Sequence, residues 1–159
     1  MADPIAIYAA VVSTVVFGWD IVKWRRQERL RLVGHASANV IVGPPFGANI
    51  FYISLQVDNR GHIPCQISSV IMWVYENRFD VLRKKTCAAF VVIDTKTDWT
   101  GQKLPYRLGP GDTYRGLCEQ TTELERLSRE KLLYIGVAHS MAKRPFMVRL
   151  KAVEVVGTV

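Results

Sequence analysis

Cysteine is scarce in this chain of 159 residues, and its three cysteines do not form close pairs. Cys65, Cys87 and Cys118 are separated by long stretches of other residues and are odd in number. They therefore make neither a CxxC metal motif nor the even set of a small disulfide-bonded domain. Because free thiols are typical of a reducing compartment, the cysteines favour a cytoplasmic domain.

Sequence patterns of catalysis and of metal binding are missing as well. His62 and Cys65 lie three residues apart, but a zinc site needs four ligands, and neither other histidine has a partner nearby in the sequence. The run Gly109-Pro-Gly-Asp112 lacks the spacing and the lysine of a phosphate-binding loop. Asp94 and Asp98 lack the spacing of a calcium loop. We therefore expect no catalytic residue, metal or cofactor. His62 and Cys65 are interpreted as a turn histidine beside a half-buried cysteine. The glycine-containing run is interpreted as a tight turn, and the two aspartates as solvated loop acids.

The positive charge is not arranged as in a nucleic-acid-binding protein. The net charge is +7, but no stripe of Lys and Arg interleaved with aromatic residues appears, so no nucleic-acid partner is predicted. Two basic clusters lie near predicted loops: Arg83, Lys84 and Lys85, and Lys143 and Arg144. Each is interpreted either as a solvated loop tip or as a loop that binds a partner, the membrane or a phosphorylated ligand.

Charged residues are absent from Ile5 to Trp19. As a helix this run is about 23 Å long, shorter than the roughly 30 Å hydrocarbon core of a bilayer. Continuation to Trp24 supplies the missing length, with Lys23 snorkelling to the interface and the two tryptophans in the aromatic belt. The segment is predicted to be a transmembrane helix; the alternative is a buried helix of a soluble domain.

Basic residues are missing before the apolar run and follow it closely. A cleaved signal peptide has the opposite polarity, with its positive charge ahead of the apolar core. By the positive-inside rule, we expect a single-pass protein of the inner (plasma) membrane, with its C-terminal domain in the cytoplasm and a few N-terminal residues outside. The basic residues are also expected to contact anionic lipid headgroups. The residues assigned to the membrane interface are Trp19, Lys23, Trp24, Arg25, Arg26, Arg29 and Arg31.

The rest of the chain is predicted to be mainly β. Residues 51–58 alternate between apolar and polar side chains, which is typical of a strand with one buried face. One short crossover helix is expected from Thr122 to Lys131, because Thr122 and Glu125 match a capping box. About seven short strands separated by turns favour an immunoglobulin-like antiparallel β-sandwich. The other predicted strands cover residues 38–42, 63–75, 88–93, 113–118, 133–137 and 146–152.

The longest of these runs, residues 63–75, is apolar on both faces, as in a central or covered strand. Regular alternation places Ile67, Ile71 and Trp73 on the core face, and Trp73 is the candidate for the buried tryptophan of an immunoglobulin-like domain. No cysteine lies on the second strand, so the antibody type with its inter-sheet disulfide is excluded. The remaining apolar residues of the run are assigned to the other face: Val70, Met72 and Val74.

Two turn motifs point to a group of proteins. Residues 57–70 carry the pattern V-x-N-x-G-x-x-P-x-x-I-x-x-V, and residues 108–112, Leu-Gly-Pro-Gly-Asp, form a turn ahead of a strand. With these motifs the chain resembles small, uncharacterised, membrane-anchored bacterial proteins that carry an immunoglobulin-like domain. The resemblance implies a shape and a location, and it implies no reaction.

The sequence therefore predicts two parts, a transmembrane anchor with its basic flank over residues 1–33 and a β-sandwich domain over residues 34–159. The expected function is a non-catalytic, membrane-tethered cytoplasmic module that binds an unidentified protein, with membrane lipids as further partners. The alternative is a membrane-bound sensor whose basic loops hold an anionic small molecule or a lipid headgroup; a hydrolase with an unrecognised site is the third hypothesis. Homo-oligomerisation is a further hypothesis, because Ala6 and Ala10 have the small-xxx-small spacing of paired transmembrane helices.

Overall fold

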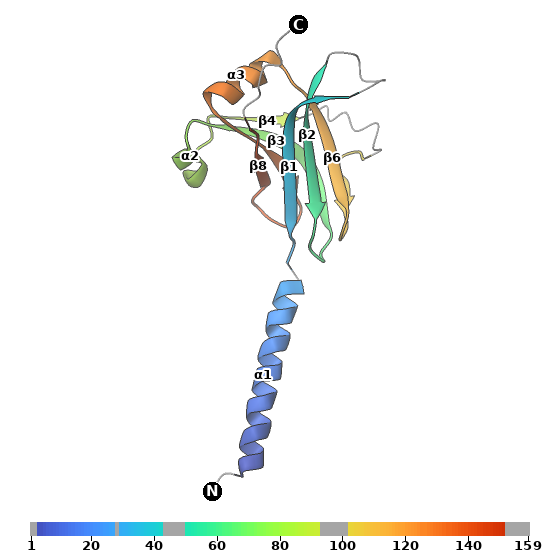
Figure 1. Ribbon diagram of the computed structural model, residues 1–159, viewed down its shortest axis with the longest axis vertical. Helices are drawn as coiled ribbons and strands as arrows, with labels where there is room; N and C mark the ends of the chain where they lie inside the picture. Colours follow the sequence, from blue (N-terminus) through green and yellow to red (C-terminus); the bar gives the residue numbers. More distant parts are fainter. Residues whose placement is uncertain (1–2, 28, 43–49, 93–101, 152–159) are drawn as a thin grey trace.

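The computed structural model describes residues 3–27, 29–42, 50–92 and 102–151, which form one long helix and one β domain (Figure 1). Helix α1 (Pro4–Gln27) projects from the domain, and every residue of its apolar part is exposed. Its segment Pro4–Trp24 is long and apolar enough to cross a membrane. No residue of this segment is buried in the structure. The alternative of a buried core helix is therefore wrong.

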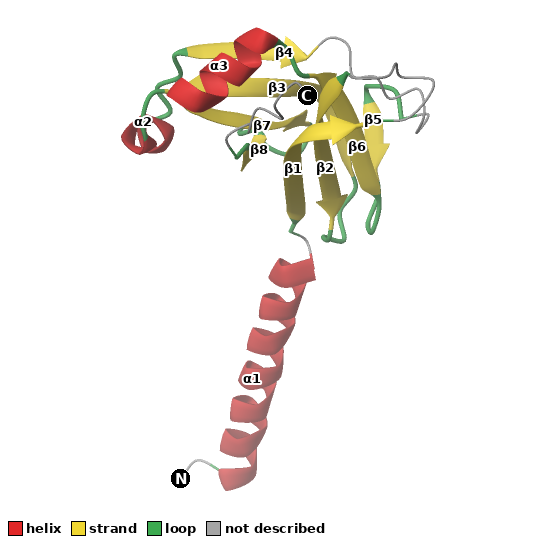
Figure 2. Ribbon diagram, turned by 45° about the horizontal axis from the view of Figure 1, so that its top comes forward, coloured by secondary structure: helices red, strands yellow, loops and turns green. Residues whose placement is uncertain are grey.

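The domain consists of two antiparallel sheets, as predicted (Figure 2). One sheet has the order β1-β2-β6, and the other has the order β4-β3-β7-β8, with β5 paired to the first residues of β3. This arrangement is consistent with an immunoglobulin-like sandwich. The strands are β1 (Leu32–Ile41), β2 (Phe51–Asn59), β3 (Cys65–Tyr75), β4 (Ala88–Val92), β5 (Tyr106–Leu108), β6 (Thr113–Glu119), β7 (Leu132–His139) and β8 (Phe146–Arg149).

From Ile53 onwards strand β2 has the alternation that the sequence predicts, whereas Tyr52, which alternation assigns to the polar face, is buried. Ile53, Leu55 and Val57 are buried in the core between the sheets. Burial of each such side chain stabilises the fold by about 1.5–3 kcal/mol. Strand β1 was predicted to begin at Ala38, but it begins at Leu32, because six further residues pair with β2. Helix α1 is therefore followed within a few residues by the first strand.

The prediction of which side chains of β3 face the core is correct for Ile67 and wrong for the residues after it. The register of β3 against β7 shifts between Ile67 and Ser69, so one extra residue changes which face the following side chains occupy. Trp73 is buried, but it lies outside the core cluster, on the other face of the sheet. After the bulge the residues that lie in the core are Val70, Met72 and Val74.

Two short helices connect the strands. Helix α2 (Arg78–Arg83) was not predicted, and neither was β5. Helix α3 (Thr122–Glu130) crosses from one sheet to the other as expected, but its N-cap is Thr121 rather than Thr122. The Thr121 hydroxyl accepts from the Leu124 amide at 3.4 Å, and Glu125 accepts from the Gln120 side chain instead of reaching back to the cap.

The two sides of the sandwich differ in how they close. On one side, β8 packs against β1, and the Phe146 ring occupies the space beside Gly34; a Cβ at Gly34 would lie 2.5 Å from that ring. On the other side, the described strands β4 and β6 are each hydrogen-bonded to one neighbour only. Among the described residues the sandwich is therefore closed along β1 and β8, whereas β4 and β6 do not pair with each other. On β6, the Thr113 carbonyl and the Arg115 amide bond to the Gln102 side chain instead.

Candidate functional site

The chain leaves α1 through residues that the sequence assigns to a membrane interface. Trp19, Lys23 and Trp24 lie exposed on α1, and the positions of Arg25 and Arg26 fall in its last turn. Exposed Arg29 and Arg31 precede β1. These seven residues therefore follow one another at the junction between the helix and the domain.

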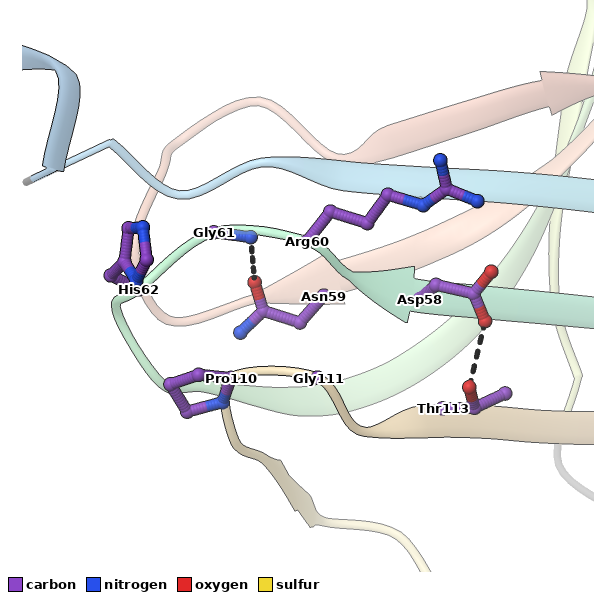
Figure 3. A pocket seen from close by; sticks show the side chains of 8 residues that line it. All are labelled: Asp58, Asn59, Arg60, Gly61, His62, Pro110, Gly111 and Thr113. Carbon is purple, nitrogen blue, oxygen red and sulfur yellow. Dashed lines mark hydrogen bonds between the residues drawn. The ribbon is translucent and has the colours of Figure 1, made fainter.

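The turn between β2 and β3 is built around a buried asparagine, Asn59 (Figure 3). Its side-chain amide donates to the carbonyls of Ile63 at 2.8 Å and Leu108 at 3.3 Å, and its side-chain oxygen accepts from the Gly61 amide at 3.0 Å. Its backbone carbonyl also accepts from the Gly111 amide at 2.8 Å. Gly111 has a φ of +81°, which glycine adopts without strain. Asn59 therefore joins two turns, and the motif V-x-N-x-G describes a structural element.

A pocket of about 530 Å³ lies beside this turn (Figure 3). Its carboxylate, Asp58, accepts from the Thr113 hydroxyl at 2.8 Å and from the Gln56 amide at 3.0 Å. The Arg60 side chain extends along β1, whereas His62 lies at the tip of the turn (Figure 3). Asp58 and His62 lie apart along this turn (Figure 3).

A second cleft, of about 470 Å³, lies between β4 and β6. Its floor includes Met72 and Val92, and Leu124 of α3 lies along one wall. Phe90 and Val91 of β4 line it while 41% and 59% of their surface stays exposed. Natural proteins usually protect such an edge with a charge, a proline or a bulge, and β4 contains none of these.

This cleft was not predicted from the sequence. The one available signal was the uncharged run at residues 88–92, which carries no gatekeeper residue. The wall opposite β4 comes from Cys118 and α3, which are distant from β4 in the sequence. Glu119 and Glu123 lie at its rim, and no basic residue lines it among the residues described.

The two basic clusters lie at different ends of the domain. Arg83 is the last residue of α2, Lys84 is its C-cap and Lys85 follows; α2 itself comes shortly after the end of β3. Lys143 and Arg144 lie in the hairpin between β7 and β8, beside the beginning of β3, because His139 pairs with Ile67. All five are exposed. They do not form one common site.

The histidines and cysteines are also dispersed. His62 is exposed and Cys65 is buried, so the two side chains do not form a reactive pair. Burial raises the pKa of the Cys65 thiol, and burial followed by the Glu119 charge raises the pKa of Cys118 to about 11. Over the described ranges no three His, Cys, Asp or Glu side chains gather as metal ligands. Asp94 and Asp98 fall outside the described residues.

Comparison with models of protein families, with curated protein sequences and with solved structures finds no match to this chain. The resemblance to membrane-anchored bacterial proteins therefore stays a prediction. The function has to be argued from the geometry of the domain itself.

Proposed function

We propose that the chain is a non-catalytic protein-interaction module, tethered to the inner membrane by α1 with its sandwich in the cytoplasm. The observation that supports this best is the open edge of β4 beside an apolar cleft. An extended segment of a partner would pair with β4 by main-chain hydrogen bonds and place an apolar side chain in the cleft. The exposed Phe90 and Val91 supply the apolar contact.

The cleft also suggests the chemistry of the partner segment. Its volume of about 470 Å³ is large enough to admit apolar side chains of a partner beside Phe90 and Leu124. The carboxylates of Glu119 and Glu123 at the rim favour a neighbouring Lys or Arg on the partner. The partner is therefore an extended segment in which an apolar residue adjoins a basic one.

The position of β4 agrees with a partner that approaches from the cytoplasm. Strand β4 and α3 lie on the side of the domain away from α1 (Figures 1 and 2). A tethered domain meets membrane-bound partners at a raised effective concentration, so a modest intrinsic affinity suffices. By the positive-inside rule, the basic residues after α1 would place the domain, and with it the edge of β4, on the cytoplasmic side of the membrane.

The test is site-specific photo-crosslinking of the full-length protein in intact cells. A photoreactive phenylalanine analogue at exposed Ala89 of β4 is expected to give a discrete adduct, and the same probe at exposed Arg149 of β8 is not. Val91→Lys is expected to reduce the adduct at Ala89 at least about tenfold, because a lysine on an edge strand opposes pairing with a further strand.

Ile41→Lys is the matched control, because Ile41 is 67% exposed and Val91 is 59% exposed. It should leave the adduct unchanged. Equal adducts from Ala89 and Arg149, or equal loss with both lysine variants, would show that β4 is not the binding edge.

A further inference from the structure

A short link holds the domain near the membrane. From Trp24 the helix continues to Gln27, and β1 begins at Leu32. Three helical steps and five extended ones span at most about 22 Å. The headgroup layer of a bilayer is itself about 6 Å thick on each side. With α1 in a bilayer, the end of the domain from which α1 leaves therefore lies beside the headgroups.

This link is fixed against the domain. The Arg60 amide donates to the Arg31 carbonyl at 2.8 Å. Gly61 is buried against the same backbone, where a Cβ would lie 2.6 Å from the Arg29 carbonyl oxygen and from the Arg31 amide nitrogen. The β2–β3 turn therefore lies against the link, and the same end of the domain stays near the bilayer.

The hairpin between β7 and β8 lies at this end too. The Ser140 amide donates to the Gln66 carbonyl at 3.0 Å, and the Ser140 hydroxyl accepts from the Gln66 amide at 3.1 Å. Gln66 lies at the start of β3, directly after the turn that contacts the link. The hairpin exposes Met141, Lys143 and Arg144, and half of the Met141 surface is open to solvent.

Charge at this end is predominantly positive. Arg29, Arg31, Lys143 and Arg144 are exposed. Among the turns described there, the exposed acid is Asp112, whose carboxylate accepts from the Gly109 amide at 2.8 Å. The link also contains Glu28 in the sequence. An apolar side chain between basic ones fits the boundary between headgroups and acyl chains.

We propose that the β7–β8 hairpin, with Arg29 and Arg31, binds anionic lipid headgroups of the bilayer that holds α1. Lys143 and Arg144 contact the phosphates, and Met141 enters the headgroup boundary. The domain is thereby held in one orientation, with β4 directed away from the membrane. This inference rests on the proposed anchoring, but it uses residues at the other end of the domain from the β4 edge.

The test uses the full-length chain in lipid nanodiscs. An environment-sensitive fluorophore is attached to Ala142→Cys in a Cys87→Ser background, which keeps Met141, Lys143 and Arg144 in place. Discs of phosphatidylcholine alone are compared with discs that contain about a third phosphatidylglycerol. Quenching by acrylamide, which is uncharged, reports the fraction of hairpins that are docked, and co-elution with the discs reports anchoring separately.

Anionic discs are expected to protect the fluorophore, and salt at about 1 M, which shortens the Debye length to about 3 Å, should remove the protection. Each basic residue near the surface contributes about fivefold to the docking equilibrium constant. The double variant K143Q/R144Q should therefore lower this constant roughly 25-fold. The matched variant K84Q/K85Q removes the same charge at the other end of β3 and should change nothing.

Two results would overturn the proposal: equal quenching in neutral and anionic discs, or equal loss of protection in both double variants. If the protein co-elutes with the discs in either case, the anchoring stands and the headgroup site alone fails. If it does not co-elute, the anchoring fails as well.

Discussion

Replacement of Asn59 by alanine tests whether the turn between β2 and β3 depends on one buried side chain. Asn59 is fully buried, and its amide group makes three hydrogen bonds, to Ile63, Leu108 and Gly61. Asn59→Ala leaves two carbonyls and one amide without these partners. At about 1 kcal/mol for each bond, the free energy of unfolding should fall by about 3 kcal/mol. That is a large part of the roughly 5–15 kcal/mol of a typical domain.

The assay is urea unfolding of the full-length protein in detergent, followed by far-ultraviolet circular dichroism. With an m-value of about 2 kcal/mol/M, the midpoint should fall by about 1.5 M. Asn77→Ala is the matched control, because the Asn77 side chain accepts one bond from the Asp80 amide at 2.9 Å at the exposed start of α2. It should cost about 1 kcal/mol or less. An Asn59→Ala cost no larger than that of Asn77→Ala would refute the reasoning.

Three further predictions concern packing and titration. Gly136→Ala should lower the free energy of unfolding by roughly 3 kcal/mol, because its Cβ would clash with the Phe146 carbonyl; the urea midpoint measures this. A maleimide at pH 7 should label exposed Cys87 first, and mass spectrometry should show half-buried Cys118 reacting only as the pH approaches its pKa of about 11. Burial lowers the pKa of His139 in the folded domain, so its contribution to stability is full above the unfolded value of 6.5 and is lost as the pH falls towards the folded pKa. His139→Gln should therefore weaken the loss of stability between pH 7 and pH 5, as urea midpoints at the two values would show.

Much of the fold could be predicted from local pattern. Strand β2 alternates from Ile53 onwards because one face is buried, and the turn after it contains asparagine and glycine in the positions that the hydrogen bonds require. Helix α3 was located to within one residue at each end, although its cap is Thr121. Such features depend on neighbours in the sequence, so periodicity and turn chemistry are sufficient to find them.

Other features depend on contacts between distant residues. The bulge in β3 is visible only in its pairing with β7, so alternation assigned Trp73 to the wrong face. Strand β5 has three residues and exists because it pairs with the start of β3. The cleft joins β4, β6 and α3, and no local pattern brings these together. The basic clusters were found by composition, but only the topology shows that one lies near α1.

The central claim is that α1 anchors a cytoplasmic domain. It is tested most directly by alkaline extraction of membranes combined with protease treatment of intact spheroplasts and of opened ones. The protein should stay in the membrane pellet, and the domain should be digested only after the cells are opened. Release into the soluble fraction would contradict the anchor, and digestion of the domain in intact spheroplasts would contradict the orientation.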